Sequence, residues 1–180
     1  MKSTTQSMQH AIGLELILIA GLCGGLAEVV WATAYSSLTT ISAAQIGREI
    51  TRSVFPALAS LPAAPMLGLV IHLVLSVALG FVFARVVWIP VTRHLHPAIS
   101  MISAVAVLGV IWALNFFVVL PALNPAFVTL MPYSATFVSK SLFGIAMAWV
   151  LQNYVVQVKG FFESRSRLIN QRAWSPRRAR

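Results

Sequence analysis

Charged residues are scarce in this chain of 180 amino acids. Asp, Glu, Lys and Arg make up 9% of them, whereas soluble domains carry about 25%. Apolar residues make up 58% of the chain. Few charges among so many apolar residues exclude an ordinary water-soluble fold and indicate an integral membrane protein.

The chain is also poor in residues and motifs that support catalysis. Cys23 is the only cysteine, which excludes an intramolecular disulfide and a cysteine-based metal or cluster site. The sequence contains no nucleophile elbow, phosphate-binding loop, HExxH motif or dinucleotide fingerprint. We therefore predict that the protein is not an enzyme and that it holds no cofactor or metal.

Long apolar stretches make up most of the chain. Each of four is long enough for a helix to cross a hydrocarbon core of about 30 Å. The alternating strands of a membrane barrel are missing. The expected fold is an all-α membrane protein, a four-transmembrane-helix bundle in one domain (1–158) that is followed by a basic tail (159–180). The predicted spans are about 12–35, 65–89, 98–120 and 134–156.

The connection between the first two spans predicts a short amphipathic interfacial helix over residues 43–55, ended by Pro56. Ser42 followed by Gln45 resembles a helix-capping box. The simplest interpretation is a surface helix that covers the mouth of the bundle. The connection from Pro121 to Tyr133 is apolar and uncharged, and we expect it to dip against the same end. The apolar stripe of the helix is Ile46, Ile50, Val54 and Phe55, opposite Arg48, Glu49 and Arg52.

The basic residues predict the orientation. Ten lie at or near the two termini and the loop around 90–97, whereas only Arg48 and Arg52 lie on the opposite side. Basic flanks stay in the cytoplasm, so we expect both termini there. A cleaved signal peptide is the competing interpretation of the first span, with Ala32-Thr33-Ala34 as the cleavage box. The length of that span and its two glutamates disfavour cleavage.

One strongly polar residue interrupts each span: Glu28, His72, Asn115 and Lys140. At a rise of about 1.5 Å per residue, all four lie about 9–10 Å inside the outer end of their spans. Ionisable groups at membrane depth are costly to keep and often mark functional sites. We therefore predict an intramembrane polar layer in the outer half of the bundle.

Two interpretations of this layer stay open. Glu28 and Lys140 could form a pair that a proton or small ion breaks, with His72 as a relay, because imidazole changes charge near neutral pH. The pair could instead be structural, with His72 as a packing residue. Haem held between two histidines is disfavoured because only one histidine lies in the layer. Metal binding is disfavoured because Lys140 would repel the ion.

Small residues at four-residue spacing predict the packing faces of the helices. They share these faces with the polar residues, which places Glu28, His72 and Lys140 inside the bundle. The third span shows no such stripe, and Asn115 there shares a face with Trp112 instead. The predicted packing positions are Gly21, Gly25, Gly68, Ser76, Gly80 and Gly144.

The order of these features resembles the YagU-like proteins, a group of small bacterial inner-membrane proteins. The resemblance rests on the glycine-rich first span with its acid, the second span GLVIHLVLSVALG, and the NPAF segment before the last span. It implies four helices and a bacterial inner-membrane location. The group has no settled biochemical function, so the resemblance implies none.

Two functions remain candidates at this point. The first is a membrane protein that handles a proton, ion or small solute at the polar layer, which with only four spans requires a homo-oligomer. The second is an accessory or assembly subunit of a larger membrane complex, with a structural charge pair. In either case the basic tail is expected to bind anionic lipid headgroups. No nucleic-acid partner is expected.

Overall fold

The structure is a computed structural model that describes residues 2–89 and 96–173, with side chains described within 13–89 and 96–153. All regular elements of these residues are helical. In chain order they are α1 (Lys2–Leu38), α2 (Ala43–Val54), the 3-10 helix η1 (Pro56–Leu58), α3 (Ala64–Phe83), the π-helix η2 (Ala84–Trp88), α4 (Pro97–Leu114), the π-helix η4 (Asn115–Val119), α5 (Leu120–Leu123), α6 (Pro125–Leu130) and α7 (Tyr133–Ala173).

Within the described residues, four helical segments are long and apolar enough to cross a membrane. They confirm the predicted bundle of four spans, and α2 confirms the short helix between the first two. α7 continues to Ala173, so the expected boundary between the fourth span and the basic tail falls inside one helix. The expected loop around 90–97 lies mostly outside the described residues. The segments are Gly13–Leu38, Ala64–Trp88, Pro97–Leu123 and Tyr133–Asn153.

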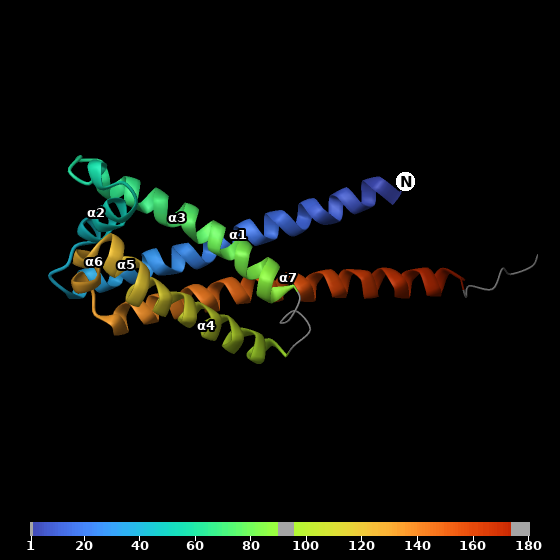
Figure 1. The fold of residues 1–180 in the computed structure, drawn as a ribbon. Helices are drawn as coiled ribbons and strands as arrows, with labels where there is room; N and C mark the ends of the chain where they lie inside the picture. The colour runs from blue at the N-terminus through green and yellow to red at the C-terminus, as the bar shows by residue number, and fades with distance from the viewer. Residues whose placement is uncertain (1, 90–95, 174–180) are drawn as a thin grey trace, which may run out of the picture.

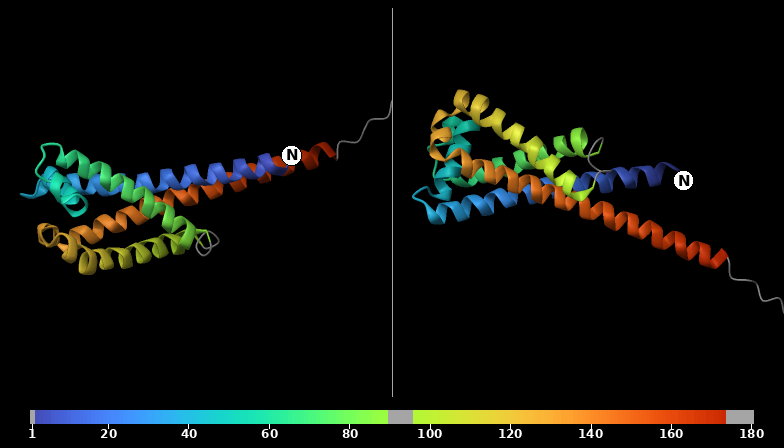
Figure 2. Two further views of the ribbon diagram at one scale, coloured as in Figure 1. Left: turned by 45° about the horizontal axis from the view of Figure 1, so that its top comes forward. Right: turned by 90° about the horizontal axis from the view of Figure 1, so that it is seen from below.

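The helices α1 and α7 form the centre of the bundle (Figure 1). They pack along each other, α3 packs on α1, and α4 packs on α7. As Figure 2 shows, α3 and α4 converge toward the end at which the chain passes from one to the other, and diverge toward α2 and α6. At the converging end Phe83, Leu108, Phe143 and Met147 share one buried apolar core. The bundle is therefore closed at this end.

Glycines bring the helix backbones together. A methyl group at Gly80 would lie 2.6 Å from Cα of Gly21, where α3 crosses α1. A methyl group at Gly25 would meet the Ser76 side chain at 2.6 Å, and one at Gly144 would lie 3.0 Å from Leu108 on α4. Five of the six predicted packing positions therefore lie where the four long helices touch.

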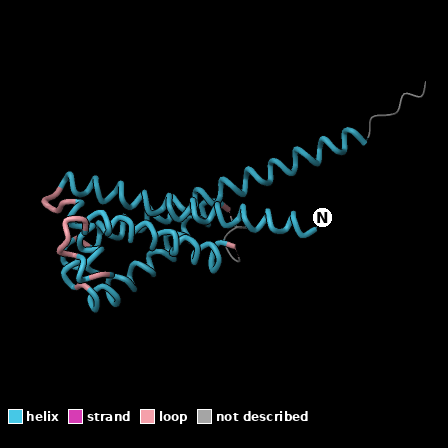
Figure 3. Tube along the Cα trace, turned by 90° about the horizontal axis from the view of Figure 1, so that it is seen from above, coloured by secondary structure: helices cyan, strands magenta, loops and turns pink. Residues whose placement is uncertain are grey.

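The short helices and loops gather at the diverging end of the bundle, as Figure 3 shows. We call residues 39–63 and 120–132 the cap. Ser42 begins α2, because its hydroxyl accepts a hydrogen bond from the backbone N–H of Gln45 at 3.1 Å. Gly68, the sixth predicted packing position, lies against the backbone of Gly47 on α2. α2 thus lies directly on the start of α3.

The predicted polar face of α2 is wrong at one residue. Glu49 was expected to face water, yet only 8% of it is exposed. The cause is that α2 packs on α3 through Gly47 and Thr51, whose hydroxyl donates a hydrogen bond to the carbonyl of Ala64 at 2.6 Å. This packing turns Glu49 inward, while Val54 at the end of the predicted apolar stripe stays exposed.

The contact between α2 and α3 has no room for a methyl group. We expect Gly68→Ala to lower the free energy of unfolding by about 1–3 kcal/mol, because overpacking forces two backbones apart. Thermal unfolding of the purified protein in detergent measures the loss. Gly13→Ala is the matched control, since nothing lies within 4 Å of the added methyl group. Equal melting temperatures for the two variants would contradict this packing.

Candidate functional site

Three contacts fix how α1 and α7 face each other. The two helices run in opposite directions, so positions that ascend along α1 meet positions that descend along α7. Gly24 lies against the ring of Phe143, and Trp31 donates a hydrogen bond from its indole N–H to the carbonyl of Ala135 at 2.9 Å. Between these two contacts, the side chains of Glu28 and Lys140 meet.

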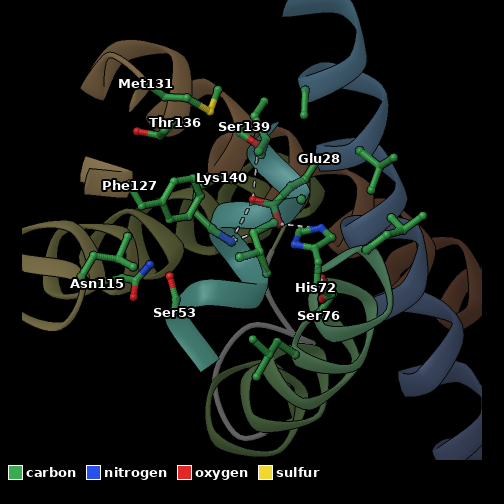
Figure 4. Close-up of a pocket in the computed structure, with 18 of the residues that line it drawn as sticks. Glu28, Ser53, His72, Ser76, Asn115, Phe127, Met131, Thr136, Ser139 and Lys140 are labelled. Atoms are coloured by element: carbon green, nitrogen blue, oxygen red, sulfur yellow. Dashed lines mark hydrogen bonds and ion pairs between the residues drawn. The ribbon is translucent and has the colours of Figure 1, made fainter. Parts of the chain in front are cut away.

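Glu28 and Lys140 form a buried ion pair (Figure 4). The Nζ atom of Lys140 lies 2.8 Å from Oε1 of Glu28 and 3.1 Å from Oε2. Only 7% of the Glu28 side chain and 20% of the Lys140 side chain are exposed. Lys140 also lies over the ring of Phe143, at 5.0 Å from its centroid. The pair cancels two charges that would otherwise be costly at this depth.

His72 joins this pair from α3. Its Nε2 atom lies 3.2 Å from the carbonyl oxygen of Gly25 and 3.7 Å from Oε2 of Glu28. Ser139, on α7, places its hydroxyl 3.5 Å from the same carboxylate. Three of the four predicted polar residues therefore come together, one from each of three spans.

Asn115 stays apart from this cluster. It begins the π-helix η4, and no described residue forms a hydrogen bond with its side chain. Figure 4 shows its amide pointing away from its own helix, across the cavity described below. Together with Ile111 and Trp112 it lines that cavity, in agreement with the predicted grouping of these residues on one face. π-helical turns occur frequently at functional sites.

A cavity of about 860 Å³ separates Asn115 from the other three residues. Its back wall comes from α1 and α7, its side walls from α3 and from α4 with η4, and its roof from α2 and α6. It lies at the diverging end of the bundle, between the apolar core and the cap. Glu28, His72 and Lys140 therefore line an accessible space and are not sealed inside packed side chains.

The cap contains a second polar cluster that the sequence did not predict. The side-chain NH2 group of Asn124, between α5 and α6, shares its two hydrogens among three acceptors: the Glu49 carboxylate at 3.0 Å, the Glu49 carbonyl at 3.1 Å and the Ser53 hydroxyl at 3.1 Å. Arg52 pairs with the same carboxylate. This cluster joins the two halves of the cap. The sequence feature that could have indicated this cluster is the step from Asn124 to Pro125 in an otherwise apolar connection.

Neither cluster resembles a metal centre. Within the described residues, no three His, Cys, Asp or Glu side chains lie close enough together to hold a metal ion. Glu28 and His72 could supply two ligands, but the ammonium of Lys140 already occupies the space beside the carboxylate. The polar groups at this site are hydrogen-bond donors and acceptors and one pair of opposite charges.

Comparisons with known proteins assign no family to the chain. No family model matches it, and searches of curated proteins and of solved structures found no match. The similarity to YagU-like proteins therefore stays a prediction. The function has to be argued from the geometry of the site.

Breaking the ion pair from one side should be far more costly than removing it. We expect Lys140→Met to lower the free energy of unfolding by about 3–5 kcal/mol, because it leaves the buried Glu28 carboxylate unpaired. The double variant Glu28→Gln/Lys140→Met should recover most of this loss. Thermal unfolding of both variants measures the difference. If the double variant is no more stable than Lys140→Met, the two charges do not depend on each other.

The cap cluster gives a separate prediction. Asn124→Asp replaces the NH2 group, whose two hydrogens serve all three contacts, by a negative charge beside Glu49, so the two halves of the cap should separate. Hydrogen exchange should then speed up in α2 and α6 but not where α1 and α7 pack together. Thr129→Val is the control, since the Thr129 hydroxyl is exposed and bonds only within its own turn. If hydrogen exchange in α2 and α6 is unchanged in Asn124→Asp, the contact between Asn124 and Glu49 does not hold the two halves of the cap together.

Proposed function

We propose that this protein handles a proton, ion or small solute at the site formed by Glu28, His72 and Lys140. The observation that carries the proposal is the position of the ion pair, which lines a cavity of about 860 Å³. A pair needed only for helix register could be enclosed by packing on every side. Here a solute in the cavity can reach both members of the pair.

The pair has the properties of a switch. A proton on Glu28, or a ligand group that binds either member, competes with the contact between Lys140 and the carboxylate. The Nε2 atom of His72 lies 3.7 Å from that carboxylate and donates its hydrogen to the carbonyl of Gly25, so the ring nitrogen that is free to accept a proton is Nδ1. Protonation or binding would thus loosen the contact between α1 and α7 at the point where the cavity begins.

The location belongs to the same proposal. The resemblance to YagU-like proteins supports a bacterial inner-membrane location, and the excess of basic residues near the termini supports both termini in the cytoplasm. The cap then faces outward, and the cavity lies in the outer half of the membrane. With four spans, the protein would act as a homo-oligomer.

Ion movement through purified protein in liposomes tests the proposal. Under an imposed K⁺ diffusion potential, we expect proton or sodium uptake above that of protein-free liposomes, read by entrapped pH and sodium dyes. Glu28→Gln/Lys140→Met should fall to the protein-free rate although it folds, because the exchangeable charges are gone. Glu15→Gln, which removes an exposed carboxylate from the same helix, should keep the wild-type rate. Equal rates in both variants would contradict the role of the pair.

A second candidate, an accessory subunit of a larger membrane complex, is favoured by one observation. α3 and α4 expose many large apolar side chains, Val74 and Val110 among them, which another membrane protein could cover. Purification in mild detergent, with the mass read together with co-purifying proteins, separates the two candidates. A homo-oligomer alone supports solute handling. Stoichiometric recovery with other membrane subunits supports the accessory role instead.

A further inference from the structure

An open side of the cavity faces the membrane interior. α1 and α7 close its back, α2 and α6 close its roof, and α3 and α4 meet in the core below it. One open side is the gap between α3 and α4, and the exposed residues Thr33, Ala43 and Ala44 line the cavity at another edge, where α1 is followed by α2. Exposed apolar residues of the spans, Met66 and Leu75 on α3 and Leu114 on α4, line the cavity along this gap. A molecule dissolved in the bilayer can therefore reach the cavity from the side.

The walls of the cavity are segregated by polarity. Most of its polar groups lie at the back, on α1, α7 and the inward face of α3, whereas Asn115 at the start of η4 lies on the opposite wall and Ser53 on α2 lies in the roof. Its apolar side chains lie toward the gap and the roof. At about 860 Å³ the space is at the upper end of ligand pockets, which span about 300–1,000 Å³, and it far exceeds the needs of a single ion.

We infer that the cavity binds an amphiphile from the membrane, with an uncharged hydrogen-bonding head at the back wall and an apolar chain that leaves between α3 and α4. Long-chain alcohols, monoacylglycerols and isoprenoid alcohols belong to this class. The inference rests on the proposed function, since it identifies the class of the small solute. It requires no bond to form or break.

Charge decides the nature of the head. Glu28 and Lys140 already neutralise each other at 2.8 Å. A charged head would leave one net charge in a wall of low dielectric, which is costly, whereas an uncharged head leaves the pair intact. An uncharged head can also use the hydrogen-bonding groups that the pair does not consume.

Two such groups are on the walls. When Nε2 of His72 donates to the carbonyl of Gly25, the Nδ1 atom of the neutral ring is an acceptor, and no described residue bonds to it. The amide of Asn115 likewise has no described partner and offers both donors and an acceptor. A polar side chain without a partner at membrane depth is costly, so a hydroxyl-bearing head that bonds to it stabilises the complex.

The test uses a monoacylglycerol with a photoreactive diazirine in its acyl chain, added to liposomes that contain the full chain. After illumination, mass spectrometry maps the labelled residues. We expect the label on cavity-lining residues of α3, α4 and η4. Unlabelled monoacylglycerol should compete, whereas glycerol, which lacks the chain, and lysophosphatidic acid, which carries a charged head, should compete weakly.

A matched pair of variants tests the side opening. Leu75→Trp places a bulky ring at the gap and should abolish labelling of the cavity. Val74→Trp alters the neighbouring exposed residue, which does not line the cavity, and should leave labelling unchanged. Asn115→Leu should weaken competition about threefold to tenfold, the effect of one lost hydrogen bond.

Several outcomes would overturn the inference. Label spread evenly over the lipid-facing helices would mean that the chain only contacts bulk lipid. Competition by lysophosphatidic acid equal to that by monoacylglycerol would refute the uncharged head. If glycerol competes as well as monoacylglycerol does, the apolar chain contributes nothing to binding and the inference fails, while the proposed solute handling stands. Conversely, ion uptake that is unchanged in Glu28→Gln/Lys140→Met would refute the handling of a proton or ion by the pair, whatever the labelling shows.

Discussion

The ion pair between Glu28 and Lys140 is the constraint on which the bundle depends. A lone charge at this depth costs at least a few kcal/mol, so each of the two side chains has to face the other. A shift of one residue along either helix would turn its side chain by about 100° and separate the charges. The pair thus sets the register of α1 and α7, the two helices on which α3 and α4 pack.

The shape of the cavity follows from where the small residues lie on these central helices. Gly21 lets α3 approach α1, and Gly144 lets α4 approach α7. α3 and α4 are thus each held by a different central helix, and within the described residues they both contribute to the buried core at the converging end. Toward the cap they separate. The space between them is not a packing defect but the result of two independent helix contacts.

The sequence predicted the features that depend on one helix at a time. Span length follows from apolar composition, and the inward position of Glu28 and Lys140 follows from glycines at four-residue spacing and from depth. The burial of Glu49 could not be predicted this way. Within α2 alone it belongs to the polar face, and only the packing of Gly47 on Gly68 and the partner Asn124, 75 residues further on, turn it inward.

The π-helix at Asn115 could not be predicted from the sequence either, because a helical period of 3.6 residues contains no sign of a locally wider turn. The wider turn does not remove Asn115 from the wall of the cavity. The amide of Asn115 still lines the cavity, on the wall opposite Glu28 and Lys140. Three of the four polar side chains meet, and Asn115 faces them across the cavity.

The same pair that sets the helix register also limits the chemistry of the site. Lys140 directs two short contacts at one carboxylate, so a ligand that displaces it has to replace both and also compensate the exposed charge. A proton on Glu28 would remove the negative charge but would leave the ammonium of Lys140 without a counter-charge in the same wall. A larger ligand binds most readily when it leaves the pair intact and uses His72 and Asn115 instead. In the proposed function, a solute bound at Asn115 leaves the atoms of the ion pair free, whereas His72 is shared between the proposed proton relay and the proposed solute site.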